Sequence, residues 1–273
     1  MPFLPAIRCA AAALVVALLG ACSSPAPPTS SAAASTSVPA ALTDDGHGDG
    51  YEYRIRYPDL TPEWEPLARA LRDYAAARKK DLLDGVVAGE RAANDAPAVL
   101  DLEFDVARRT EDFVSVLAQG SVHAGNGGTP LAASFVLHPG DNRLIAVGDL
   151  FDDSAAALKA LSQECARQLQ GRFEASLRQT ADSKTLAPAL AAMQAGVERG
   201  TAAQAENFRV FLVDGIDSKA IGLTLIFAQA QLGMTSGGEQ QVEVPAKVFY
   251  TLLKAEYRDA FAVDLKEVPA DVR

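Results

Sequence analysis

The sequence predicts an α+β fold, with mainly antiparallel sheet, packed helices and two subdomains. Several short segments alternate apolar and polar residues with a period of two, which is typical of half-buried strands. These strands come in groups joined by hairpin turns and precede the helices, so the parallel crossovers of a doubly wound fold are not expected. Hydrophobic residues make up 49% of the 273 positions, which is enough for a substantial core.

The first subdomain is expected over residues 51–130. Residues 51–57 alternate tyrosine or isoleucine with glutamate or arginine and predict its first strand. A helix is expected over 62–85, because a proline at its start and leucines at helical spacing are typical of an amphipathic helix. The alternation returns over 100–106, which predicts a second strand, and a third strand is expected over 113–119.

The second subdomain is expected over residues 131–265 and combines hairpins with two long helices. Its expected elements are a hairpin of 133–137 and 144–147, helices over 154–179 and 188–198, a hairpin of 208–213 and 220–227 around Asp214–Gly215, a strand at 241–244 and a last helix opening at Pro245. On the first of these helices Leu161, Cys165 and Leu169 recur at helical spacing, which predicts a buried apolar stripe.

Residues 1–21 have the pattern of a secretory signal peptide. Arg8 precedes an uncharged apolar run over residues 10–19, which is too short to span a bilayer as a helix. The run leads into Leu-Gly-Ala-Cys, which resembles the lipobox of bacterial lipoproteins, so Cys22 is expected to be the lipid attachment site. A plain secretory signal with a chance cysteine is the alternative. Ser23, in place of an aspartate, favours the outer membrane facing the periplasm if the cell is Gram-negative, with membrane contact through the lipid only.

The lipidated cysteine and the residues behind it, 22–50, are expected to form a disordered tether. The segment is rich in Ser, Pro, Ala, Thr, Gly and Asp and cannot bury enough apolar surface to offset the entropy of ordering it. His47 is interpreted as a solvated tether residue, because a metal site needs more convergent ligands than this segment offers.

Cysteine positions exclude an intrachain disulfide. Cys9 leaves with the signal peptide and Cys22 carries the lipid, so Cys165 is the one thiol expected in the folded part. Its place on an apolar helical stripe predicts a buried, structural cysteine.

Charge and motif searches exclude several function classes. The chain has 25 basic and 35 acidic residues, a formal net charge of −10, so no nucleic-acid partner is expected. Its three histidines form no His-Glu-x-x-His pattern, and neither a Gly-x-Ser-x-Gly nor a Ser-x-x-Lys motif occurs. We therefore expect no catalytic residues, no metal and no cofactor, and a protein that is not an enzyme.

Two glycine-rich loops at strand ends, 121–128 and 229–240, are the candidate binding sites. Such loops are where binding residues are often placed on a rigid scaffold. The candidate ligand-binding residues in them are His123, Asn126, Gln229, Gln231 and Met234. For His123 the alternative is that its imidazole ties the loop to the sheet by hydrogen bonds.

Several short motifs in order resemble one family. They are YPDL at 57–60 followed by a helix, SVHAG at 121–125, VGDLF at 147–151 before a helix, and the run from 227 through Gly-Gly-Glu to 245. In this order they resemble the extracytoplasmic domain of RsiV-type anti-sigma factors, also found ahead of the catalytic domain in PdaC-type peptidoglycan deacetylases. The resemblance implies a two-part α+β module without its own catalytic centre that recognises envelope ligands, of which lysozyme is the best known.

Three functions remain open. The first is a lipid-anchored binding module of the envelope, whose ligand is a lysozyme, another protein or a peptidoglycan-related molecule. The second is a structural or assembly lipoprotein with a resident envelope partner. The third is an enzyme acting on peptidoglycan with a site near His123, which is disfavoured because catalytic sites usually show a recognisable base and partner.

Overall fold

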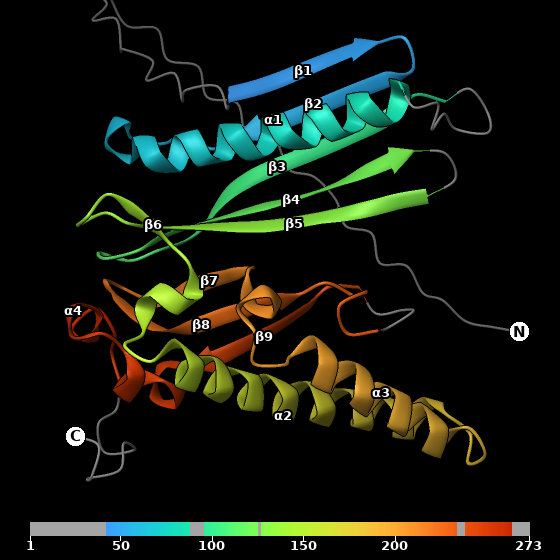
Figure 1. The fold of residues 1–273 in the computed structure, drawn as a ribbon, viewed down its shortest axis with the longest axis vertical. Coiled ribbons are helices and arrows are strands. Elements are labelled where there is room, and N and C mark those ends of the chain that lie inside the picture. Colours follow the sequence, from blue (N-terminus) through green and yellow to red (C-terminus); the bar gives the residue numbers. More distant parts are fainter. Residues whose placement is uncertain (1–41, 88–95, 125–126, 234–237, 264–273) are drawn as a thin grey trace, which may run out of the picture. The chain divides into compact units, whose positions relative to one another are not determined.

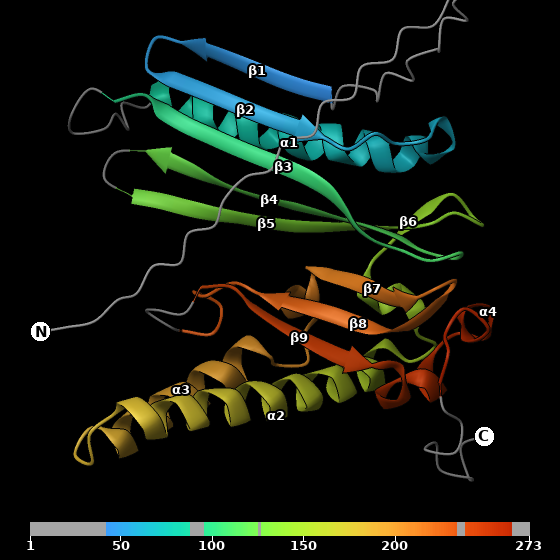
Figure 2. The same ribbon diagram turned by 180° about the vertical axis from the view of Figure 1, so that it is seen from behind.

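The computed structural model describes residues 42–87, 96–124, 127–233 and 238–263. Two sheets and their helices make an α+β fold, as the sequence predicts (Figures 1 and 2). The signal peptide, Cys22, residues 23–41 of the expected tether, Asn126 and Met234 lie outside the described residues.

The first sheet has six strands in sequential order. They are β1 (Leu42–Gly48), β2 (Tyr51–Tyr57), β3 (Ala98–Arg109), β4 (Val114–Ala124), β5 (Gly127–His138) and β6 (Arg143–Ile145). Neighbours pair antiparallel except β2 and β3, which are parallel. A parallel pair needs a crossover connection, and here it contains helix α1 (Glu65–Val87), which a 3₁₀ turn, η1 (Pro62–Trp64), introduces.

The second sheet has three antiparallel strands and carries the other long helices. The strands are β7 (Phe211–Ile216), β8 (Lys219–Phe227) and β9 (Gln240–Pro245), and the helices are α2 (Ser154–Thr180) and α3 (Leu186–Gly200). Single turns complete the chain: η2 (Val147–Leu150), η3 (Ala205–Phe208), η4 (Ala246–Val248), η5 (Tyr250–Leu252) and α4 (Ala255–Arg258). Among the described residues no helix is long and apolar enough to cross a membrane.

Each sheet has its own hydrophobic core. Helix α1 covers one face of the first sheet, and Phe104 lies in that core with 2% of its surface exposed. Helix α2 covers the second sheet and is capped by Asp153, whose side chain accepts a hydrogen bond from the Ala156 amide. Cys165 is fully buried in this core, as predicted, and burial raises the pKa of its thiol to about 12.

The expected tether of residues 22–50 differs from the structure at its C-terminal end, because β1 lies within this range and is a strand of the first sheet. The polar sequence of β1 offers few apolar side chains for packing, so β2 supplies the apolar side chains of this contact. The rings of Tyr53 and Tyr51 lie against Gly46 and Gly48, where a Cβ atom would collide with the ring. A salt bridge of 3.3 Å between Asp44 of β1 and Lys79 of α1 adds a further link. His47 is therefore an exposed strand residue.

The expected subdomain boundary at residues 130/131 falls inside β5, so the change from one sheet to the other comes later, after β6. The second hairpin also turns later than expected. Its turn lies at Asp217, whose φ of 55° is left-handed, whereas Asp214 and Gly215 belong to β7 at a register shift. The shift was not predictable from the turn-like Asp-Gly pair alone.

The last helix expected from Pro245 is instead a run of single turns. Phe249 and Tyr257 are fully buried, so the apolar spacing does mark core residues. Leu253, however, has extended backbone angles and bridges to Phe151, which interrupts the helix.

Candidate functional site: the uncovered face of the six-stranded sheet

Strand β7 lies against the first sheet through its backbone. The Phe211 amide donates a 2.8 Å hydrogen bond to Ser134 Oγ of β5, and the Val213 amide donates one of 3.0 Å to Ser115 Oγ of β4. The two serine hydroxyls thus take the place of a neighbouring strand along this edge of the second sheet. They fix where the second sheet meets the first.

We expect Ser115→Ala to lower the free energy of unfolding by about 1–3 kcal/mol, because it leaves the Val213 amide buried without an acceptor. Ser115 is fully buried. Chemical denaturation measures the change, with Ser121→Ala as the control, because Ser121 is only half-buried. Equal stability of the two variants would contradict this role of Ser115.

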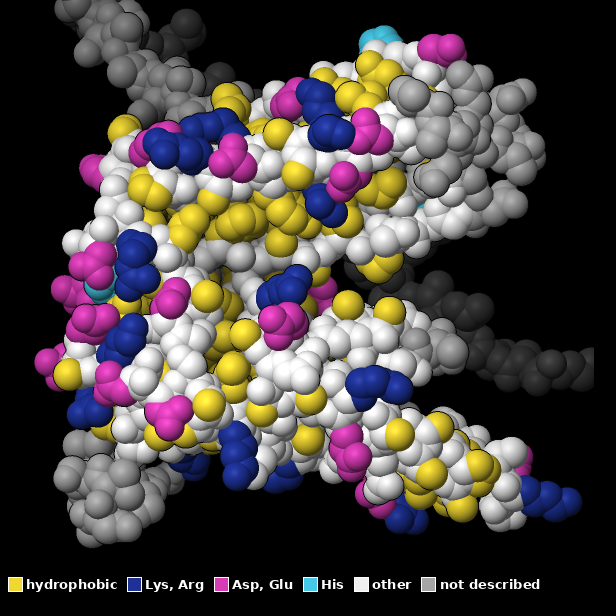
Figure 3. Space-filling view, in the orientation of Figure 1, with side chains coloured by type: hydrophobic (Ala, Val, Ile, Leu, Met, Phe, Trp, Pro, Cys, Tyr) yellow, Lys and Arg dark blue, Asp and Glu magenta, His cyan; other side chains and the backbone are white. Residues whose placement is uncertain are grey.

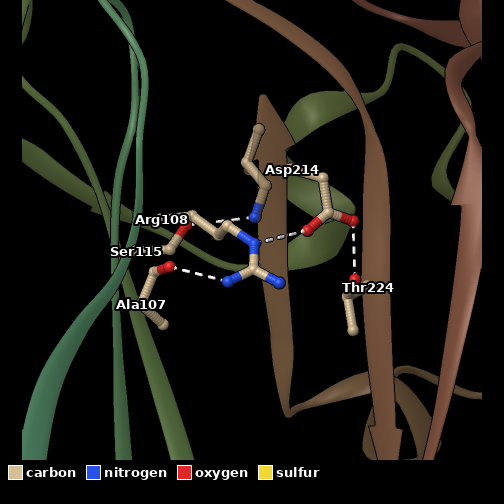
Figure 4. A network of polar contacts seen from close by, with 6 residues as sticks. Ala107, Arg108, Ser115, Asp214 and Thr224 are labelled. Atoms are coloured by element: carbon tan, nitrogen blue, oxygen red, sulfur yellow. Dashed lines mark hydrogen bonds and ion pairs between the residues drawn. The ribbon is translucent and has the colours of Figure 1, made fainter. Parts of the chain in front are cut away.

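A polar network that includes a side chain of β3 also links the first sheet to the second (Figure 4). Arg108 Nε donates to Asp214 Oδ1 at 3.1 Å, and Thr224 Oγ1 donates to Asp214 Oδ2 at 2.6 Å. Arg108 is 46% exposed and Asp214 15%, so the guanidinium reaches solvent above a mostly buried carboxylate. Beside it lies a pocket of about 430 Å³, lined by Arg108, Asp214, Gly215, Ile221, Gly222, Glu243, Val244 and Pro245.

No helix of the described residues covers the side of the first sheet away from α1 (Figure 2). The strand register places a set of polar side chains on this side. We call it the polar face. It consists of Glu52, Arg54, Arg56, Asp101, Glu103, Asp105, Gln119, Ser121 and His123. The strand register places them in rows across β2, β3 and β4, and each is half-buried or exposed. An antiparallel sheet commonly keeps one such face solvated.

Ion pairs and a hydrogen-bonded neutral pair hold side chains of the polar face in place. Arg56 Nη2 lies 2.9 Å from Glu103 Oε2 and 3.7 Å from Asp101 Oδ1, and the hydrogen bond to Glu103 raises the pKa of Arg56. Ser121 Oγ and His123 Nε2 are 2.9 Å apart. The imidazole rests on Gly128 of β5, where a Cβ atom would come within 2.5 Å of the ring. Such groups can form hydrogen bonds and ion pairs with a partner.

The candidate ligand-binding residues predicted from the sequence lie in different surroundings in the structure. His123 is an exposed member of the polar face. Gln231 is instead a structural residue, because its Nε2 donates to the Gly200 carbonyl at 2.8 Å and to the Asn207 carbonyl at 2.9 Å. Gln229 is half-buried in the same loop. On both sides of the first glycine-rich loop, strand pairing continues to Ala124 and Gly127.

Sequence reasoning missed most of the polar face and the whole Arg108–Asp214–Thr224 network. The alternation of charged residues along 101–105 was itself the signal for the face. No local signal marked the network, because Arg108 and Asp214 are 106 residues apart in the chain. Within the described residues no group of three or more His, Cys, Asp or Glu side chains could hold a metal ion.

No family model matches the sequence, and no curated protein matches it. Among solved structures, a DUF3298 family protein from Pseudomonas aeruginosa aligns over 82% of this chain and 95% of its own, with a TM-score of 0.53 and 14% identity. The chain has the DUF3298 fold. A DUF3298 member from Bacteroides fragilis aligns over 80% of this chain and 92% of its own, with a TM-score of 0.50 and 10% identity. DUF3298 comprises the RsiV- and PdaC-type domains, so the fold agrees with the motif resemblance.

Proposed function

We propose that the protein is a non-enzymatic binding module of the cell envelope, anchored by a lipid on Cys22, and that it binds a protein partner on the polar face. The observation that carries the proposal is the polar face itself, whose side chains are half-buried or exposed. No helix of the described residues covers this side of the sheet (Figure 2). Hydrogen-bonding groups on a rigid sheet suit recognition of another molecule.

The charge of this surface favours a basic partner. The polar face has four carboxylates, on Glu52, Asp101, Glu103 and Asp105, and two guanidiniums, on Arg54 and Arg56. Without Arg8 the chain has 24 basic and 35 acidic residues, a net charge of −11. Complementary charge speeds the encounter of partners and excludes wrong ones. A lysozyme, which the family resemblance suggests, is a basic protein of the required kind.

Titration calorimetry of the full chain carrying Cys22→Ala with a lysozyme tests the proposal. We expect binding at low salt that weakens at moderate salt, because exposed charges are screened. Asp105→Lys, on the polar face, should weaken binding by about tenfold, which is about 1.4 kcal/mol. The matched control is Asp73→Lys, the same charge change at an exposed position of α1, and it should have little effect.

The absence of heat at both salt concentrations would remove lysozyme as the partner. A loss of affinity with Asp73→Lys as large as with Asp105→Lys would remove the polar face as the site. A resident envelope partner is the alternative within the same function class. Chemical crosslinking in native membranes, without added lysozyme, distinguishes a resident envelope partner from a lysozyme.

A further inference from the structure

A small cavity lies at one end of the first sheet, where β1 begins, β2 ends and α1 begins (Figure 1). Its volume is about 310 Å³, and it is lined by Leu42, by residues 57–60, and by Ala68, Leu71 and Arg72 of α1. Residues 57–60 are the whole YPDL motif of the sequence. None of the lining residues belongs to the polar face, so partner binding on that face does not account for the cavity.

The walls of the cavity are mainly apolar. Leu71 is 1% exposed and forms its floor, whereas Leu42 is 67% exposed at its edge. The ring of Tyr57 is a fixed wall, because it stacks on Phe104 with ring centroids 5.2 Å apart. An alkyl chain in the cavity removes Leu42 from water, and each methylene group that it buries tightens binding by about fourfold. The volume is at the low end of the usual range for ligand sites, so a single chain suits it.

Two hydrogen-bond donors belong to the lining of the cavity. The Arg72 side chain is 53% exposed, and its Nη2 lies 3.0 Å from Glu65 Oε1. Arg69 lies 3.5 Å from the same oxygen, so Glu65 keeps a cationic partner when Arg72 turns to a ligand. Figure 3 shows basic and acidic side chains side by side over α1. The Tyr57 phenol is the second donor, because burial raises its pKa and keeps it protonated.

These donors favour a ligand with an anionic head group. Asp59 is the one carboxylate among the lining residues, and it is exposed, so solvent and salt screen its charge. The cavity thus combines an apolar floor with a guanidinium and a phenol, which together suit an alkyl chain that ends in a carboxylate.

The position of the cavity in the chain favours a membrane as the source of this ligand. Leu42 follows Cys22 by 20 residues, which span at most about 70 Å when fully extended. The lipid attachment proposed above, on which this step rests, keeps the cavity within that distance of a membrane. Hydrolysis of an acyl ester bond in a membrane lipid releases a single-chain fatty acid.

We propose that this cavity, which we call the fatty-acid site, binds a fatty acid of medium chain length. The alkyl chain lies against Leu42, Leu60 and Leu71, and the carboxylate accepts hydrogen bonds from Arg72 and Tyr57. A carboxylate held by a guanidinium makes a charge-assisted hydrogen bond, which is stronger than one between neutral groups. The site adds a small-molecule ligand to the protein partner proposed above.

Titration calorimetry of the full chain carrying Cys22→Ala with octanoate and decanoate tests the proposal. We expect decanoate to bind about tenfold more tightly, because it has two more methylene groups. Ala68→Trp places a ring in the cavity and should abolish binding. The matched control is Ala77→Trp, at an exposed position about two and a half turns further along α1, and it should leave binding unchanged. No heat with decanoate, or equal binding by the two tryptophan variants, overturns the proposal.

A surface variant tests the head group without any change to the packed wall of the cavity. Arg72→Gln should weaken decanoate binding by about tenfold, the loss of one charge-assisted hydrogen bond. Arg69→Gln removes the same charge outside the lining and should change binding by less than about twofold. Equal losses from the two variants overturn the placement of the carboxylate on Arg72.

One further variant separates this proposal from the proposed function. Asp105→Lys, which should weaken partner binding on the polar face, should leave decanoate binding unchanged. The titration uses a free fatty acid and a chain without the lipid-bearing cysteine, so its result does not depend on membrane attachment. A tenfold loss of decanoate binding in Asp105→Lys would overturn the independence of the fatty-acid site from the polar face.

Discussion

Replacing Phe104 by alanine is expected to lower the free energy of unfolding by about 3–5 kcal/mol, the cost of a large cavity in a packed core. Phe104 stacks on Tyr57 with ring centroids 5.2 Å apart. It also lies 6.2 Å from the ring of Tyr74 and 6.3 Å from that of Phe135. These rings join strands β2, β3 and β5 to α1, so their contacts connect most of the first sheet.

Chemical denaturation measures this loss. The midpoint temperature of thermal unfolding should also fall by about 10 °C for a domain of this size. Phe104→Leu is the matched control. It keeps most of the side-chain volume and should cost less than about 1.5 kcal/mol. A loss below about 1 kcal/mol for Phe104→Ala would contradict the packing of the four rings into one core.

Replacing Cys22 by alanine is expected to move the protein from the membrane to the soluble fraction of the envelope or medium. The expected diacylglycerol on this cysteine brings two acyl chains, which suffice for stable anchoring. No described helix provides another way across the bilayer. Membrane fractionation followed by salt and carbonate washing measures the distribution.

Cys165→Ala is the control for this experiment, because it removes a cysteine that is buried in the core. It should leave the protein in the membrane fraction. Membrane association of Cys22→Ala after both washes would contradict lipid attachment at this residue.

The elements that the sequence predicts well are those whose pattern is complete within the element. In β2 and over residues 100–105 of β3, apolar and polar residues alternate without interruption. Helix α2 has both a capping aspartate and an apolar stripe that ends up buried. In each case the local backbone preference and the tertiary contacts agree, so the pattern alone is sufficient.

The elements that the sequence predicts poorly depend on distant partners. Strand β1 is a polar, glycine-containing segment that forms a strand because tyrosines of β2 cover it. Residues 246–258 have helical spacing, but contacts of Leu253 with Phe151 interrupt the helix. Short-range patterns do not contain this information.

The same distinction holds for the candidate site. His123 was placed at a strand end from its local sequence, and it lies on the polar face. The role of Gln231 depends on carbonyl groups of Gly200 and Asn207, which the fold brings to it. Likewise, Ser115 meets the Val213 amide across 98 residues of chain. Side chains whose partners are remote were therefore misassigned or missed.

Site-specific photo-crosslinking in native membranes tests the polar face as the partner-binding surface most directly. A photoreactive residue replaces Gln119, which is exposed on the polar face, or Gln179, which is exposed near the end of α2. The account predicts a light-dependent adduct from position 119, with lysozyme when it is added or with a resident protein when it is not, and none from position 179. No adduct from position 119 in either condition, or equal adducts from both positions, would contradict it.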